Sequence, residues 1–134
     1  MIRVASVNVN GVRAAFRKGM QRWLDASGVD VLALQEVRAE REDLVALLGD
    51  EWSVANDEAS AKGRAGVAIA TRAHQDAIRT TLGPDTVDTA GRWIEVDITT
   101  PEGNPLTIVS CYVHSGEAGT PKQDAKYEFL DIMS

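Results

Sequence analysis

The side chains of the first part of the chain follow two different periods. Residues 2–8 alternate with a period of two, which predicts a strand, and the Asn10-Gly11 pair ends it with a turn. Over residues 14–27 the apolar side chains recur at helical spacing, which predicts an amphipathic helix. Residues 29–35 are almost continuously apolar, as in a strand covered on both faces. Strand, helix and strand in this order predict a right-handed crossover between two parallel strands.

Shorter elements are expected in the rest of the chain. They are a short helix at 44–48, strands at 51–56, 66–71, 91–99 and 106–113, a hairpin turn at 101–105, and a final helix at 122–133. The order is α/β at first and antiparallel later. The fold class expected from this order is α/β (α+β), with a mixed β-sheet flanked by helices.

This layout leaves one face of the sheet without a cover. The helices are expected on one side, and the residues up to Ser134 offer no second layer for the other side. We therefore expect an exposed apolar sheet face, larger than monomers usually leave open.

Composition is that of one soluble globular domain, with 44% hydrophobic and 25% charged residues. No stretch approaches the roughly 18 apolar residues of a membrane span, and the N-terminus lacks the basic and apolar segments of a signal peptide. The single cysteine, Cys111, suits a reducing compartment. We expect a cytoplasmic protein with no membrane partner.

Charge is unevenly distributed along the chain. The net charge of −6 argues weakly against a partner made of phosphates, but every acidic residue follows position 24. The first 24 residues contain only basic charges, which indicates a local positive region. The same residues are also explained by a solvated helix face. They are Arg3, Arg13, Arg17, Lys18 and Arg22.

Polar side chains are expected at one edge of the sheet, where strands end. Asn8 and Asn10 close the first strand, Glu36 follows the second, and Tyr112 lies near the end of the strand after the hairpin. A carboxylate that leaves the core is costly unless a cation or a donor meets it. Mg²⁺ prefers oxygen ligands and often takes one or two protein carboxylates, with water and phosphate completing its shell. Glu36 fits such a site.

Each of these residues has an ordinary structural explanation as well. Asn10-Gly11 is a common turn pair, a strand-end Glu36 is often solvated or salt-bridged, and a tyrosine with its hydroxyl at the rim of the core is common. Taken singly, none of them is specific.

Taken together, five segments resemble successive motifs of exonuclease III, in the endonuclease/exonuclease/phosphatase superfamily. Members of that family are Mg²⁺-dependent DNA-repair enzymes, which cleave beside abasic sites and in many cases remove nucleotides from 3′ ends. The resemblance implies Mg²⁺, with Mn²⁺ as an alternative ion, and double-stranded DNA with an abasic site or a 3′ end as partner. The segments are VASVNVNGVRA (4–14), VDVLALQEVR (29–38), AGVAIATR (65–72), GRWIEVDI (91–98) and VSCYVHSGE (109–117).

The resemblance also implies roles for individual residues. Glu36 takes the metal-ligand position, Asn8 supports the metal and the catalytic site, and Asn10 is a neighbouring site residue. Tyr112 matches the tyrosine that contacts the scissile phosphate. His114 stands where relatives commonly have Pro, and we interpret it as a plain loop residue without a transferred role. Residues expected along the DNA backbone are Arg13, Arg17, Lys62 and Arg64.

The chain is shorter than that family. Its members have a second half, with an Asp/Asn motif for the nucleophile and leaving group and a late Asp-His pair, and each half is expected to contribute one sheet of a two-sheet sandwich. Residues 1–134 are therefore expected to be the N-terminal part of such a domain, apparently truncated. A missing C-terminal half is expected to pack on the sheet, and the fragment alone is expected to be inactive.

Three alternatives stay open. One is a superfamily phosphatase acting on inositol phosphates or sphingomyelin, although the NGVRA segment favours the DNA-cleaving branch. Another is a non-catalytic nucleic-acid-binding fragment, whose binding would depend on salt. The last is a truncated product without a separate role. The sequence does not rank abasic-site incision against 3′ exonuclease action.

Overall fold

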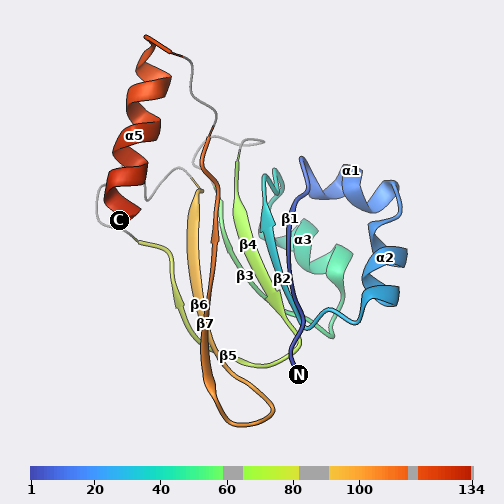
Figure 1. Ribbon diagram of the computed structural model, residues 1–134. Helices are drawn as coiled ribbons and strands as arrows, with labels where there is room; N and C mark the ends of the chain where they lie inside the picture. The colour runs from blue at the N-terminus through green and yellow to red at the C-terminus, as the bar shows by residue number, and fades with distance from the viewer. Residues whose placement is uncertain (59–64, 82–90, 115–117, 134) are drawn as a thin grey trace.

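Two β-sheets lie face to face in this protein, and helices cover the outer face of the first sheet (Figure 1). The structure is a computed structural model that describes residues 1–58, 65–81, 91–114 and 118–133. Among these residues, no helix is long and apolar enough to cross a membrane.

The first sheet consists, in spatial order, of β1 (Val4–Asn8), β2 (Val31–Gln35), β4 (Val67–Thr71) and β3 (Ser53–Asp57). β1 and β2 are parallel, with Asn8 beside Gln35, which confirms the predicted parallel pair. β4 pairs antiparallel with both β2 and β3. The sheet is therefore mixed, as expected.

The second sheet is antiparallel and consists of β5 (Gln75–Arg79), β6 (Trp93–Thr99) and β7 (Pro105–Cys111). The hairpin between β6 and β7 is confirmed, and its turn is closed by a bond of 2.8 Å from the Thr100 N–H to the Asn104 carbonyl. β5 was not predicted, because its segment QDAIR is largely polar and exposed. Its strand conformation comes from pairing with β6.

The second sheet covers the apolar face that we expected to be open. Val31, Val67 and Ile69 of the first sheet pack in one buried cluster with Ile94 and Ile98 of the second. The expectations of a single sheet and of an exposed apolar face are therefore wrong for the described residues. The physical reason is that β6 alternates, so the β6–β7 hairpin has an apolar face of its own to bury against the first sheet.

Two short helices stand where one helix was predicted over residues 14–27. α1 (Val12–Arg17) ends when the N–H groups of Lys18 and Gly19 bond back to carbonyls of its last turns. Gly19 has a φ of +107°, which other residues rarely adopt, and this turns the chain into α2 (Met20–Ser27). The predicted stop at Gly28 is confirmed, because Gly28 has a left-handed conformation at the end of α2.

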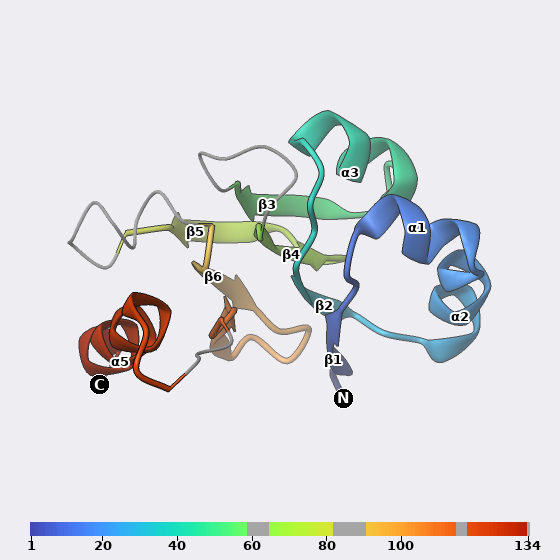
Figure 2. The same ribbon diagram turned by 90° about the horizontal axis from the view of Figure 1, so that it is seen from above.

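The remaining helices lie on opposite sides of the molecule (Figure 2). α3 (Arg41–Leu48) packs with α1 and α2 over the first sheet, and α5 (Pro121–Met133) lies beside the second. Phe129 of α5 is fully buried. His114 is 7% exposed, and its Nε2 donates to the Lys122 carbonyl at 3.0 Å. His114 is thus a loop residue, as interpreted, but it is a buried one, and its bond ties the loop after β7 to the start of α5.

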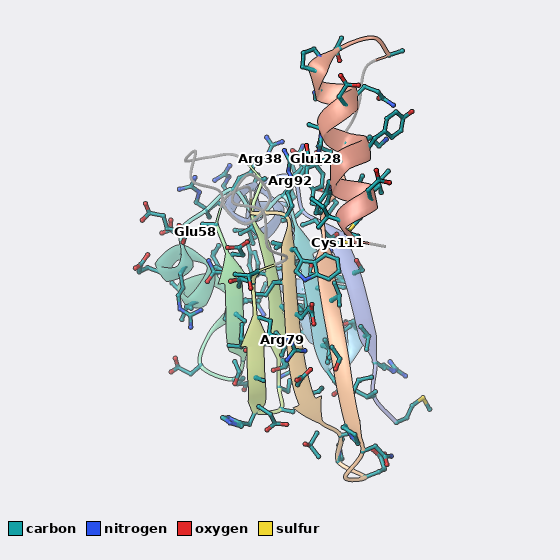
Figure 3. The ribbon with its side chains drawn as sticks, turned by 90° about the vertical axis from the view of Figure 1, so that its left-hand side faces the viewer. Arg38, Glu58, Arg79, Arg92, Cys111 and Glu128 are labelled. Atoms are coloured by element: carbon teal, nitrogen blue, oxygen red, sulfur yellow. The ribbon has the colours of Figure 1, made fainter. Side chains whose placement is uncertain are left out.

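A charged cluster holds the outer face of the second sheet together. Arg79 of β5 bonds to Asp97 of β6 at 2.8 Å and to Glu95 at 3.1 Å, and Thr107 of β7 donates to Asp97 at 2.7 Å. Figure 3 shows Arg79 on this face of the sheet. The hydrogen bonds from Arg79 and Thr107 lower the pKa of Asp97 to about 2.

This pKa predicts a loss of stability in acid. A carboxyl whose pKa is depressed by folding stabilises the protein above its unfolded pKa, and this contribution is lost as the pH falls from about 4 to about 2. In Asp97→Asn, the free energy of unfolding, measured with urea, is expected to fall less over this pH range than in the wild type. The control Asp50→Asn, at an exposed position after α3, should leave the decline unchanged. Equal declines in wild type and Asp97→Asn would contradict the prediction.

Candidate active site

The ends of β1 and β2 bring Asn8 and Glu36 together. The two strands are parallel and in register at Asn8 and Gln35, so Glu36 follows directly at the same edge. The Asn8 Nδ2 donates to the Glu36 Oε1 at 3.1 Å. The predicted juxtaposition of the amide and the carboxylate is therefore present.

Asn10 acts on Asn8 through its backbone. Its N–H donates to the Asn8 Oδ1 at 3.1 Å, which fixes the orientation of the Asn8 amide. Asn10 has a φ of +46°, a conformation that asparagine tolerates better than most residues. Gly11 then donates to the Glu36 carbonyl at 2.8 Å. The Asn10-Gly11 turn is thus structural, and it also joins the loops that follow β1 and β2.

The Glu36 carboxylate lies among several hydrogen-bond donors. Its side chain is 14% exposed, and the Arg38 Nη2 bonds to its Oε2 at 2.9 Å. The hydrogen bond from Asn8 lowers the pKa of Glu36 most, burial opposes this, and hydrogen bonds from Tyr112 and Arg38 lower it further. Glu36 and Arg38 have φ values of +51° and +53°, so the backbone on which this ion pair stands is strained.

Tyr112 reaches the same carboxylate from the second sheet. It follows the end of β7, where its N–H donates to the Arg92 carbonyl at 2.9 Å. Burial raises the pKa of Tyr112, and its hydrogen bond to Glu36 raises it further. The hydroxyl therefore stays protonated near Glu36. The structure brings Asn8, Glu36 and Tyr112 together, as the sequence predicted.

A polar link that sequence reasoning missed joins three strands below these residues. The Gln35 Nε2 donates to the Ser110 Oγ at 3.0 Å and to the Ser6 Oγ at 3.2 Å, and Ser110 donates to the Leu34 carbonyl at 2.9 Å. Ser6, Gln35 and Ser110 come one or two positions before Asn8, Glu36 and Tyr112. The link sets how β7 lies against β2. Its only sequence signal is a serine inside the apolar run VSCYV.

Removing this link is expected to destabilise the protein. Ser110 is 1% exposed, so Ser110→Ala takes a donor from the buried Leu34 carbonyl and an acceptor from Gln35. We expect a loss of roughly 1–3 kcal/mol in the free energy of unfolding, measured with urea. Ser53→Ala is the matched control, because the Ser53 hydroxyl makes no hydrogen bond within the part of the chain that the structure describes. Equal stability of the two variants would contradict the prediction.

Three arginines line a hollow beside Glu36. The hollow measures about 510 Å³, and its walls include Arg13 and Arg17 of α1 together with Arg38. Arg13 is 3.7 Å from Asp43, and both side chains are largely exposed. Arg38 was not among the predicted DNA-binding residues, because the LQEVR segment was interpreted through its carboxylate. The other two predicted DNA-binding residues, Lys62 and Arg64, lie outside the described residues.

The Glu36 carboxylate suits Mg²⁺ as a ligand, provided that one of its oxygens is released from its protein partner. Among the described residues, no cluster of three or more His, Cys, Asp or Glu side chains is placed to hold a metal. A single carboxylate is enough for Mg²⁺ when water and phosphate oxygens complete the shell. Both carboxylate oxygens, however, have protein partners, Asn8 and Arg38. The salt-bridged alternative for Glu36 is thus present, and a cation would reach Oε2 only if Arg38 moved aside.

Several solved structures share this fold. An AP endonuclease from Archaeoglobus fulgidus is 25% identical with a TM-score of 0.83, and the match covers 99% of this chain and 49% of that one. A 3′ phosphatase from Neisseria, bound to product DNA hairpin, is 20% identical with a TM-score of 0.81, over 99% and 50%. An AP endonuclease from Leishmania major is 18% identical with a TM-score of 0.76, over 98% and 46%.

The chain spans about half the length of these proteins. The sequence profile of the endonuclease/exonuclease/phosphatase family matches residues 5–133, which span the described elements from the second residue of β1 to the end of α5. The mixed sheet flanked by helices and the motifs at the strand ends agree with this match. The chain belongs to the endonuclease/exonuclease/phosphatase family.

Proposed function

We propose that this chain is the N-terminal part of a Mg²⁺-dependent DNA-repair nuclease of the exonuclease III type, which hydrolyses DNA phosphodiesters. The observation that carries the proposal is the Glu36 carboxylate, bonded to Asn8 and Arg38 and influenced by Tyr112, beside a hollow lined with arginines. The AP endonucleases with the same fold support DNA as the substrate. Double-stranded DNA with an abasic site or a 3′ end is the proposed partner.

In this proposal each residue has a distinct task. Glu36, supported by Asn8, would hold Mg²⁺, with Mn²⁺ as an alternative ion. When bound, the ion supplies positive charge against the phosphate oxygens of the substrate. The Tyr112 hydroxyl donates a hydrogen bond to an oxygen of the scissile phosphate. Asn10 keeps the Asn8 amide turned toward Glu36 through its backbone bond.

The arginines and the lysine are assigned to the DNA backbone. Arg13 and Arg17 flank the hollow, and their guanidinium groups suit the neighbouring phosphates. Lys62 and Arg64, which precede β4 in the sequence, are also proposed to contact the DNA backbone. This electrostatic binding is expected to weaken as salt rises, because counterions are released on binding.

Activity is proposed to need a second half of the fold. Solved relatives are about twice as long, and β1 and β7 are outer strands of their sheets. Outer strands present unpaired backbone groups to which further strands can be added. We propose that a C-terminal half packs along these edges and supplies the groups that orient the attacking water. A cytoplasmic location is proposed with it, since the free Cys111 suits a reducing compartment.

A cleavage assay tests this function. The chain alone, and the chain joined to a second half from a solved relative, are incubated with duplex DNA carrying one abasic site, with Mg²⁺ or with a chelator. We expect cleavage only by the joined protein with Mg²⁺. Cleavage that survives the chelator, or Mg²⁺-dependent cleavage by the chain alone, would contradict the proposal.

A second candidate is removal of a 3′ phosphate from DNA, which the Neisseria relative favours. The same assay decides it when duplexes with a 3′ phosphate and with a 3′ hydroxyl are added. Inositol phosphates and sphingomyelin complete the substrate panel. Mg²⁺-independent DNA binding without turnover of any substrate would instead favour the non-catalytic binding module.

A further inference from the structure

Arg38 faces two different partners at the candidate site. Its guanidinium bonds to the Glu36 Oε2 at 2.9 Å, and its side chain also lines the hollow shared with Arg13 and Arg17. Figure 3 shows Arg38 at the same end of the sheets as Arg92, far from Arg79. We propose that Arg38 is a binding switch, which neutralises Glu36 in the free protein and turns to a DNA phosphate when substrate enters. This inference rests on the function proposed above.

The carboxylate cannot serve both cations well at once. Asn8 engages its Oε1 and Arg38 engages its Oε2, so a divalent ion would meet a guanidinium already bound to its ligand. Two positive groups on one carboxylate repel each other at close range. Arg38 therefore competes with Mg²⁺ for Glu36 as long as the ion pair persists.

Arg38 is the partner that is free to move. Its side chain is 45% exposed, whereas that of Glu36 is 14% exposed and is also held by Asn8. Water solvates the half-exposed Arg38 guanidinium when it leaves, and Asn8 continues to bond to the carboxylate. The carboxylate therefore keeps its place while the guanidinium swings away.

The hollow offers Arg38 a better partner when a phosphate arrives. Arg13 has only a long contact of 3.7 Å to the exposed Asp43, and Arg17 pairs with no carboxylate among the described residues. A phosphate placed there meets three guanidinium groups, which bind phosphate oxygens in a fork geometry. The phosphate thus draws Arg38 off Glu36 and frees the ligand for the ion.

The switch makes DNA and Mg²⁺ each promote binding of the other. Such coupling is reciprocal, and coupling of this kind typically changes affinity by about 5- to 150-fold. Two measurements on the chain report it without any turnover. Calorimetry gives the affinity for Mg²⁺ alone. Fluorescence anisotropy gives the affinity for a short duplex with a tetrahydrofuran abasic-site analogue, with and without Mg²⁺ at constant ionic strength.

Arg38→Met keeps the aliphatic stem and removes the charge, so it isolates the competition. We expect this variant to bind Mg²⁺ alone at least about 5-fold more tightly than wild type, within the usual range of coupling. We also expect the variant to bind DNA more weakly, and the slope of its DNA affinity against salt concentration to fall by the equivalent of about one phosphate contact. The effect of Mg²⁺ on DNA binding should disappear. Arg38→Lys, which keeps a movable cation, should restore most of the coupling.

Arg72→Met is the control, because the partners of Arg72 lie away from the site: the exposed Glu51 at 3.2 Å, the Val29 carbonyl and the Trp52 ring. It should behave as wild type in both measurements. If Arg38→Met binds Mg²⁺ no more tightly than wild type, or keeps the coupling, the switch is overturned while the proposed function stands. If wild type binds neither Mg²⁺ nor the duplex, the proposed function fails and the switch fails with it.

Discussion

Glu36→Gln is expected to abolish specific Mg²⁺ binding by the chain and to lower Mg²⁺-dependent DNA cleavage by the joined, two-half protein by about 10²-fold or more. Glutamine keeps the size of the side chain, and its Oε1 still accepts the bond from Asn8. The negative charge is lost, however, and with it the only described carboxylate at this end of the sheets that meets Asn8 and Tyr112. Calorimetry with Mg²⁺ and the abasic-duplex assay measure the two effects.

The fold should survive this change. Arg38 loses its ion-pair partner, but its side chain is 45% exposed and water solvates it. Glu51→Gln is the matched control, because it also removes a carboxylate from an arginine pair, at a site where the glutamate is 83% exposed. Normal Mg²⁺ binding or normal cleavage by Glu36→Gln would exclude the metal-ligand role.

Tyr112→Phe is expected to lower turnover by roughly 10- to 100-fold, the value of one hydrogen bond to a charged group. Only the hydroxyl is removed, so the ring still packs against the core between the two sheets. The hydroxyl is protonated, since burial and Glu36 raise its pKa, and it is therefore able to donate to a phosphate oxygen. The expected effect is on kcat in the joined protein, with KM nearly unchanged.

The chain's other tyrosine supplies the control. Tyr127 is exposed on α5, so Tyr127→Phe should leave both kinetic constants unchanged. Melting temperatures of the two variants complete the test. A Tyr112→Phe protein with normal turnover but a much lower melting temperature would show that Tyr112 is a structural residue only.

Local pattern was enough to predict most elements and the centre of the site. The apolar run before Glu36 requires a buried strand, and the parallel pairing of β1 and β2 then places Asn8 beside Glu36. Such predictions succeed because strand period and crossover geometry are properties of neighbouring residues. The helix break at Gly19 was missed because the apolar spacing continues across it.

Contacts between distant segments decided the rest. β5 is a strand because β6 offers it partners, and the second sheet covers a face that the chain appeared to leave open. The ion pair of Arg38 with Glu36 depends on the positive φ of these two residues, which sequence spacing does not reveal. Ser110 contacts Gln35 across 75 positions of sequence.

The sequence by itself determined which segments become strands and helices, and that amides, a carboxylate and a tyrosine stand at the ends of strands. Only the tertiary structure decided how many sheets form and that a polar link fixes how β7 lies against β2. It also decided that Arg38 is the cation that pairs with Glu36 in the free protein. The difference has a physical reason. The hydrophobic pattern of a segment reports which of its own side chains are buried. The strand with which it pairs, and the charge that neutralises its side chains, depend on other segments that packing brings beside it.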